Sequence, residues 1–121
     1  MATGTLTPTL TLSSTDLFSD TLSLSNTDSL SITGDREINR TKMAASQADT
    51  IIYAHATYTR AMVYLKNVDS TTAILVDIGT QIAMQIEPGE FAFFPWESAA
   101  EVRAKAEDDN TPILEHGIFE F

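Results

Sequence analysis

The chain of 121 residues contains no cysteine, few basic residues and no catalytic signature. Without cysteine, neither a disulfide framework nor a thiolate metal site can form. Cysteine usage therefore does not indicate whether the protein works in an oxidising or a reducing compartment. No serine lies in a GxSxG pattern, and the five glycines form neither GxGxxG nor GxxxxGK(S/T). The sequence therefore predicts no catalytic nucleophile and no phosphate-binding loop, and we expect a protein that is not an enzyme.

Positive charge is also scarce, with seven Lys and Arg residues against seventeen Asp and Glu residues and a formal charge of −10. Such a balance repels nucleic-acid phosphates and anionic lipids. The N-terminus, MATGTLTPTL, lacks the basic residues and apolar core of a secretion signal, and no apolar run approaches the roughly 20 residues of a membrane span. We expect a soluble, unprocessed chain of one domain that binds neither nucleic acid nor membrane.

The only histidines, His55 and His116, are not part of an HExxH motif. They would form a metal site only if they met in space beside a carboxylate, so we expect each to be a surface or hydrogen-bonded side chain. The acidic run from Glu107 to Asn110 lacks the DxDxDG spacing of a calcium loop and is predicted to be a solvated turn. We expect no metal and no cofactor.

The N-terminal region is rich in Thr and Ser and contains an internal repeat. LTLSSTD, which begins at Leu10, matches LSLSNTD, which begins at Leu22. Leucines two positions apart lie on one face of a strand, and the Ser/Asn-Thr-Asp ends favour turns. We predict an extended β arm over residues 1–33 rather than a solvated tail. Its apolar residues are the candidate subunit interface: Leu6, Leu10, Leu12, Leu17, Phe18, Leu22 and Leu24.

Residues 34–121 are predicted to form a β-sandwich domain, because short β-rich runs alternate with turns at intervals of about ten residues. Glu87 to Glu90 has the Pro-Gly pattern of a type II turn with positive φ at Gly89. The expected strands are 51–53, 61–65, 73–78, 82–86, 91–96 and 112–121, and the residues expected to be mostly buried are Leu65, Ile74, Val76, Ile86, Phe93 and Phe94. In the strand 82–86, Ile82, Met84 and Ile86 are expected on one buried face.

Two segments are ambiguous. Residues 97–107 have alanines and a Glu101 to Lys105 spacing that suit a helix, whereas Val102, Ala104 and Ala106 alternate as in a strand, and we favour the strand. A short helix is considered within residues 40–48. The fold class expected overall is all-β: an antiparallel, jelly-roll-like β-sandwich with an extended Ser/Thr-rich arm.

AMVYLKNVDSTTAILVDIG, IAMQIEPGEFAFFPWESAAEVRAKA and the terminal EHGIFEF resemble small structural proteins of tailed bacteriophages. In these proteins a "YLKN"-like strand precedes an "I-x-PGEF-x-F-x-P" turn and strand. The resemblance covers residues 61–121 and implies a capsid decoration or cement protein on the exterior of the virion. It would contact the major capsid protein or other virion subunits and copies of itself.

Two other functions stay open at this stage. One is a tail, neck or baseplate structural protein of the same kind of virion. The other is a ligand- or carbohydrate-binding β-sandwich module, which would have a concave site near Trp96, Tyr53 or the histidines. A cupin-like protein would add clustered metal-binding histidines, which this sequence lacks.

Overall fold

A computed structural model describes residues 3–121, and within that range every regular element is a strand. It contains, among the residues described, no helix that is long and apolar enough to cross a membrane. The strands of the arm are β1 (Gly4–Leu6), β2 (Thr9–Ser14), β3 (Leu22–Thr27) and β4 (Leu30–Ile32). Those that follow are β5 (Arg36–Lys42), β6 (Thr50–Tyr53), β7 (Ala61–Asn67), β8 (Ile74–Ile78), β9 (Gln81–Ile86), β10 (Phe91–Trp96), β11 (Val102–Ala106) and β12 (Ile113–Glu120).

Strands β5 to β12 form two four-stranded antiparallel sheets, with orders β10-β7-β12-β5 and β6-β11-β8-β9. Their pairs are nested along the chain: β5 pairs with β12, β6 with β11, β7 with β10, and β8 with β9. Nested pairs divided between two sheets define a jelly roll, which joins two Greek keys into one sandwich. The predicted fold class is therefore confirmed.

The core fills the space between the two sheets. Val63 and Leu65 of β7 and Leu114 and Ile118 of β12 lie fully buried on one side, and β8 and β11 supply the other side. Alternating burial along β7 and β11 matches the period of two that strands impose. Four of the six residues predicted to be mostly buried belong to this core, namely Leu65, Ile74, Val76 and Ile86.

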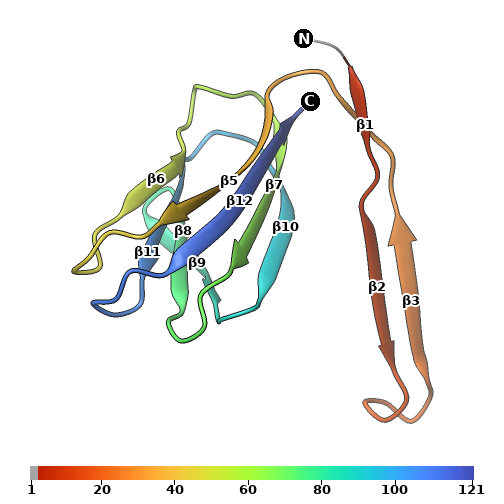
Figure 1. Cartoon of the computed structure of the whole chain (residues 1–121). Helices are drawn as coiled ribbons and strands as arrows, with labels where there is room; N and C mark the ends of the chain where they lie inside the picture. The colour runs from red at the N-terminus through yellow and green to blue at the C-terminus, as the bar shows by residue number, and fades with distance from the viewer. Residues whose placement is uncertain (1–2) are drawn as a thin grey trace.

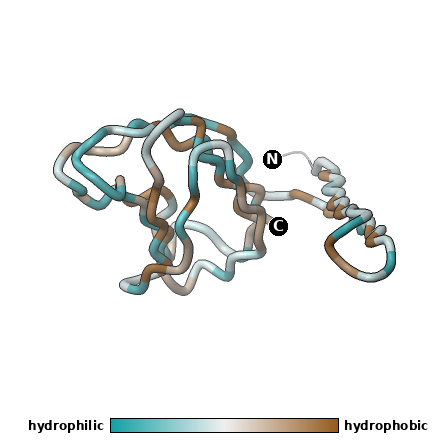
Figure 2. Tube along the Cα trace, turned by 90° about the horizontal axis from the view of Figure 1, so that it is seen from below, coloured by the Kyte–Doolittle hydropathy of each residue, from teal (hydrophilic) through white to brown (hydrophobic). Residues whose placement is uncertain are grey.

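The two copies of the Leu-Ser/Thr repeat become β2 and β3, which pair with each other in antiparallel register. Closer to the body, β1 pairs with β4, and Pro8 interrupts the hairpin between the two ladders. None of the arm strands described pairs with a strand of the sandwich. In both views the arm extends beside the sandwich as a separate hairpin (Figure 1, Figure 2). The arm boundary at residue 33 stays a prediction. Ile32, the residue before it, is already buried.

Three details of the predicted strands are wrong. Residues 36–42 form β5, and no helix occurs within residues 40–48. Phe93 is 37% exposed, and Ile82, expected on a buried face, lies exposed on the edge strand β9. Sequence patterns overlooked β5 because nearly all of this edge strand is exposed and polar, and so it lacks an apolar face.

Two turn and strand predictions are confirmed. Gly89 has a φ of 85°, and the Glu90 N–H donates to the Glu87 carbonyl oxygen at 2.9 Å, closing the predicted turn. Within residues 97–107, Val102–Ala106 is the strand β11, and no helix forms. The alternation of small apolar residues outweighs helix propensity here, because β11 lies between β6 and β8 with one face in the core.

Candidate interaction surface

The β2–β3 hairpin has one leucine face and one hydroxyl face. Leu12 lies directly opposite Leu24, and Leu10 and Leu22 are two residues away on the same face. Thr11 lies opposite Ser25 on the other face, where every side chain is Ser or Thr. Leu10 and Leu12 are 49% and 46% exposed, so the leucine face is open to solvent although it has the pattern of a buried face.

The structure places the seven candidate interface residues along the whole arm. Leu10, Leu12, Leu22 and Leu24 form the leucine face, and Leu6 is half-buried in β1 near the base. Leu17 and Phe18 are strongly exposed at the hairpin tip, where the Ser14 hydroxyl accepts the Leu17 N–H at 3.1 Å. Six of the seven residues thus belong to two surfaces, the leucine face and the tip.

A second apolar surface, which sequence reasoning missed, is the outer face of the β10-β7-β12-β5 sheet. Cross-strand partners share a face, so the registers place Ile38, Tyr64, Phe91, Phe93 and Phe119 together on the side away from the core. Phe91 is 67% exposed and Ile38 60% exposed. Between them lies Gly117, where an added Cβ would come within 3.1 Å of the Glu37 carbonyl oxygen and the Ile38 side chain.

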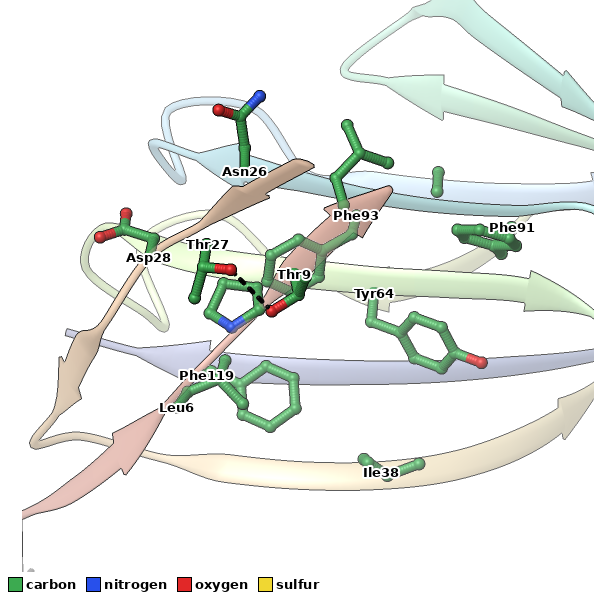
Figure 3. A pocket seen from close by; sticks show the side chains of 13 residues that line it. Leu6, Thr9, Asn26, Thr27, Asp28, Ile38, Tyr64, Phe91, Phe93 and Phe119 are labelled. Atoms are coloured by element: carbon green, nitrogen blue, oxygen red, sulfur yellow. Dashed lines mark hydrogen bonds between the residues drawn. The ribbon is translucent and has the colours of Figure 1, made fainter. Parts of the chain in front are cut away.

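A hollow of about 940 Å³ separates the arm from this outer face. Leu6, Pro8, Thr9 and Leu10 line it from the arm, together with residues 26–28. The sheet lines it with Ile38, Tyr64, Phe91, Ala92, Phe93 and Phe119. Figure 3 shows the labelled side chains of the arm together with those of the sheet, and the hydrogen bond between Thr9 and Thr27 on the arm.

Charges on the outer face are mainly positive. Arg36, Arg40, Lys42 and Lys66 lie on it by register, against one carboxylate, Glu115. These are four of the seven basic residues in a chain of formal charge −10. The arm is acidic, since Asp16, Asp20 and Asp28 are the only charged side chains in residues 3–34.

Tyr64 and Glu115 form the polar centre of the outer face. The Tyr64 hydroxyl donates to Glu115 Oε1 at 2.8 Å, and Arg40 binds the same carboxylate at 2.9 Å. These two donors lower the pKa of Glu115. Partial burial, and to a smaller extent the bond to Glu115, raises the pKa of Tyr64 to about 12. Tyr64 and Arg40 are therefore both paired with Glu115, and the Tyr64 hydroxyl stays protonated near neutral pH.

The base of the arm is bonded to the end of β12. The Gly34 N–H donates to the Glu120 carbonyl oxygen at 3.0 Å, and the Glu120 N–H donates to the Asp35 carbonyl oxygen at 2.8 Å. The Glu120 carboxylate accepts the backbone N–H groups of Asp35 and Thr59, which lower its pKa. A Cβ at Gly34 would lie 2.8 Å from that of Glu120. The direction in which the arm leaves the body is therefore fixed by close contacts.

The two histidines lie apart from this surface. His116 is buried, with Nε2 at 2.8 Å from the Thr41 hydroxyl and Nδ1 at 2.9 Å from the Tyr53 hydroxyl. His55 is exposed, 3.7 Å from Glu101. Among the residues that the structure describes, no group of three or more acidic, His or Cys side chains is arranged to hold a metal ion. Trp96 and Tyr53, suggested as parts of a concave site, are buried in the core.

Comparisons of this chain with family models, with curated proteins and with solved structures find no significant match.

Proposed function

We propose that the protein is a non-enzymatic structural subunit that assembles through its N-terminal arm and the outer face of the β10-β7-β12-β5 sheet. The observation that supports the proposal is the location of the exposed apolar side chains. Among residues 3–121, eleven large hydrophobic residues are exposed, and nine of them lie on these two surfaces. Leu10, Leu12, Leu17, Phe18 and Leu24 are on the arm, and Ile38, Phe91, Phe93 and Ile113 are on the outer face.

Exposed apolar area concentrated in this way is typical of surfaces that bind other proteins. A two-stranded ribbon is marginally stable in water and gains from packing on a neighbour. The β2–β3 hairpin pairs with no other strand in the part of the chain described, so it is well suited to a subunit that completes its packing on assembly. The acidic balance of the chain favours solubility before assembly.

Within this class, we propose a capsid decoration or cement protein on the exterior of a tailed-bacteriophage virion, with the major capsid protein as a partner. The support is the resemblance of residues 61–121 to such proteins and a jelly-roll fold, which is used in viral capsids as well as in lectins and cupins. The fold alone does not select among these uses. A tail, neck or baseplate subunit would have the same features and would differ in its position in the particle.

Mass spectrometry of purified virions whose genome encodes this chain tests the proposal. A decoration protein is expected in them at a copy number comparable to that of the major capsid protein, and a reconstruction of the particle should place it on the outer shell. A copy number of a few per particle would indicate a tail or neck subunit. Absence from the particles would overturn the virion proposal in both forms.

A ligand-binding module is the second candidate, and the exposure of Phe91 and Phe93 beside the hollow favours it. Aromatic faces of this kind stack on sugar rings and other flat ligands. Titration of the intact protein with a panel of glycans, followed by NMR, tests it. Shifts confined to residues around Phe91 and Phe93 would support ligand binding, whereas an unchanged spectrum across the panel would argue against a carbohydrate module.

A further inference from the structure

We infer that the outer face of the β10-β7-β12-β5 sheet, at the hollow beneath the arm, is the docking site for the leucine face of the β2–β3 hairpin of a second copy of this chain. The inference deepens the proposed assembly function and depends on it. It names the partner as the chain itself and the contact as sheet against sheet. The argument has three steps: the fit of the two surfaces, their charges, and the position of a copy's own arm.

The two surfaces match in length and in apolar character. The six-residue strands β2 and β3 are each about 20 Å long, which is within the length of the seven- and eight-residue strands β7 and β12. One surface has four leucines together with Ser14 and Asn26, and the other has a group of aromatic and aliphatic side chains. Facing sheets pack with interdigitated side chains at about 10 Å, so the hairpin is suited to cover the outer face as an added layer.

The charges of the two surfaces are opposite. The four cations of the outer face exceed its single carboxylate, whereas the arm has three aspartates and no cation in residues 3–34. Asp16 and Asp20 lie at the hairpin tip and Asp28 at its other end, so the leucine face has acidic groups at both ends. An arm docked on this face places these carboxylates near a positive surface, which favours encounter and orients the arm.

A copy's own arm does not supply this contact. Gly34 and Asp35 are bonded to Glu120 at the base, and Arg36 Nη2 donates to the Ile32 carbonyl oxygen at 3.2 Å across the same junction. With the base held in this way, the hairpin stands off its own sheet and the hollow lies between them. A rotation of the arm at its base that brought the hairpin onto its own sheet would break these junction bonds. The hairpin of another copy reaches the face without that cost.

Charge substitutions on the exposed faces of the full-length chain test the inference. The arm variant combines Leu12→Asp with Leu24→Asp, and the face variant combines Phe91→Asp with Phe93→Asp. The control combines Thr11→Asp with Ser25→Asp, which adds the same charges to the same strands on the opposite face of the hairpin. Sedimentation velocity over a range of concentrations measures association, and circular dichroism with a thermal melt checks that each variant is folded.

The wild-type chain and the control are expected to self-associate. The arm and face variants should each raise the dissociation constant by about tenfold or more, the usual effect of losing central apolar contacts. An equal mixture of the arm and face variants should recover a complex, because one still has an intact face and the other an intact arm. Recovery in the mixture specifically requires the arm of one copy to meet the face of another.

Three results would overturn the inference: a monomeric wild-type chain at all soluble concentrations, a control as defective as the arm variant, or a mixture that forms no complex. A monomeric wild-type chain that is nevertheless abundant in purified particles would retain the proposed virion function and replace the second copy by another virion protein. A self-associating chain that is absent from the particles would retain the docking contact and reject the virion function. The two proposals can therefore fail separately.

Discussion

The Tyr53 hydroxyl lies 2.9 Å from Nδ1 of His116, inside the sandwich. Nε2 of the same ring is bonded to the Thr41 hydroxyl, so the neutral imidazole joins β5, β6 and β12. Burial lowers the pKa of His116, and the nearby charge of Glu37 opposes that effect without reversing it. A buried histidine in this position is a structural link between the two sheets, and it also makes the fold sensitive to acid.

We predict that the free energy of unfolding decreases as the pH falls below about 6.5, the ordinary pKa of histidine. The pKa of His116 is lower in the folded chain, so the unfolded chain binds the proton first and the stabilisation is lost as the pH falls through the folded value. Urea denaturation at a series of pH values measures this slope. His116→Phe should be less stable at pH 7 but should have a flatter profile between about pH 6.5 and 5.

A second decrease is expected at lower pH. Backbone and side-chain donors lower the pKa values of Asp69, Glu115 and Glu120, so the stability they contribute is present above about pH 4.5 and lost below it. His116→Phe should leave this second decrease in place. If the wild-type chain loses stability in a single step on acidification, and His116→Phe does not alter that step, then the buried histidine does not cause the loss predicted below about pH 6.5.

Asn67 is expected to be the most sensitive polar residue of the core. Its side-chain amide donates to the carbonyl oxygens of Thr72 and Ile86 at 2.8 and 2.9 Å, and its Oδ1 accepts the Asp69 N–H. Asn67→Ala leaves these buried groups unpaired, so it should cost about 2 kcal/mol or more. Asn110→Ala, at an exposed turn, should cost less than about 0.5 kcal/mol. Equal denaturation midpoints for the two variants would contradict this role.

Much of the sandwich was predictable because short runs of β-branched, aliphatic and aromatic residues between turns mark its strands. β7, β8 and β10 have the required pattern, and β10 was predicted with its bounds unchanged. The outer face was not predictable, because its side chains come from β5, β7, β10 and β12, which are far apart in the sequence. Phe93 was assigned to the core since FAFF resembles a strand buried on both faces. One face of β10 is open because the core lies on only one side of the β10-β7-β12-β5 sheet, and the sequence of β10 does not record this arrangement.

The arm shows the same limit. The repeat predicted strands and turns, and β2, β3 and β4 follow it. Asn26 and Thr27, however, end β3 rather than forming a turn, because the antiparallel ladder with β2 extends to Thr27. Sequence spacing placed the leucines on one face. It gave no information on the Gly34 to Glu120 junction, which depends on contacts between residues more than eighty positions apart.

The turn before β10 should depend on the backbone of Gly89 alone. Its φ is 85°, and no atom lies within 4 Å of an added Cβ, so a side chain there meets conformational strain but no collision. Gly89→Val is expected to cost about 1 to 2 kcal/mol, and Gly89→Asn clearly less, because Asn tolerates positive φ. Thermal melts of the two variants provide the comparison. An equal loss in both variants would point to a cause other than backbone strain.

Phe93 and Phe94 are adjacent on β10 but should respond in opposite ways to truncation. Phe94 faces inward and packs on the core, whereas Phe93 faces the hollow beneath the arm. Phe94→Ala should lower the free energy of unfolding by about 2 to 3 kcal/mol, somewhat less than the loss at a fully buried phenylalanine. It should leave self-association unchanged under conditions where the variant is folded.

Phe93→Ala should show the reverse pattern, with a loss of stability below about 1 kcal/mol and weaker self-association, because its ring lies on the surface proposed to receive the arm. Denaturation of both variants at a concentration too low for association, followed by sedimentation of the folded chains, separates the two effects. A large loss of stability in Phe93→Ala with unchanged association would place this ring in the fold itself and remove it from the docking surface.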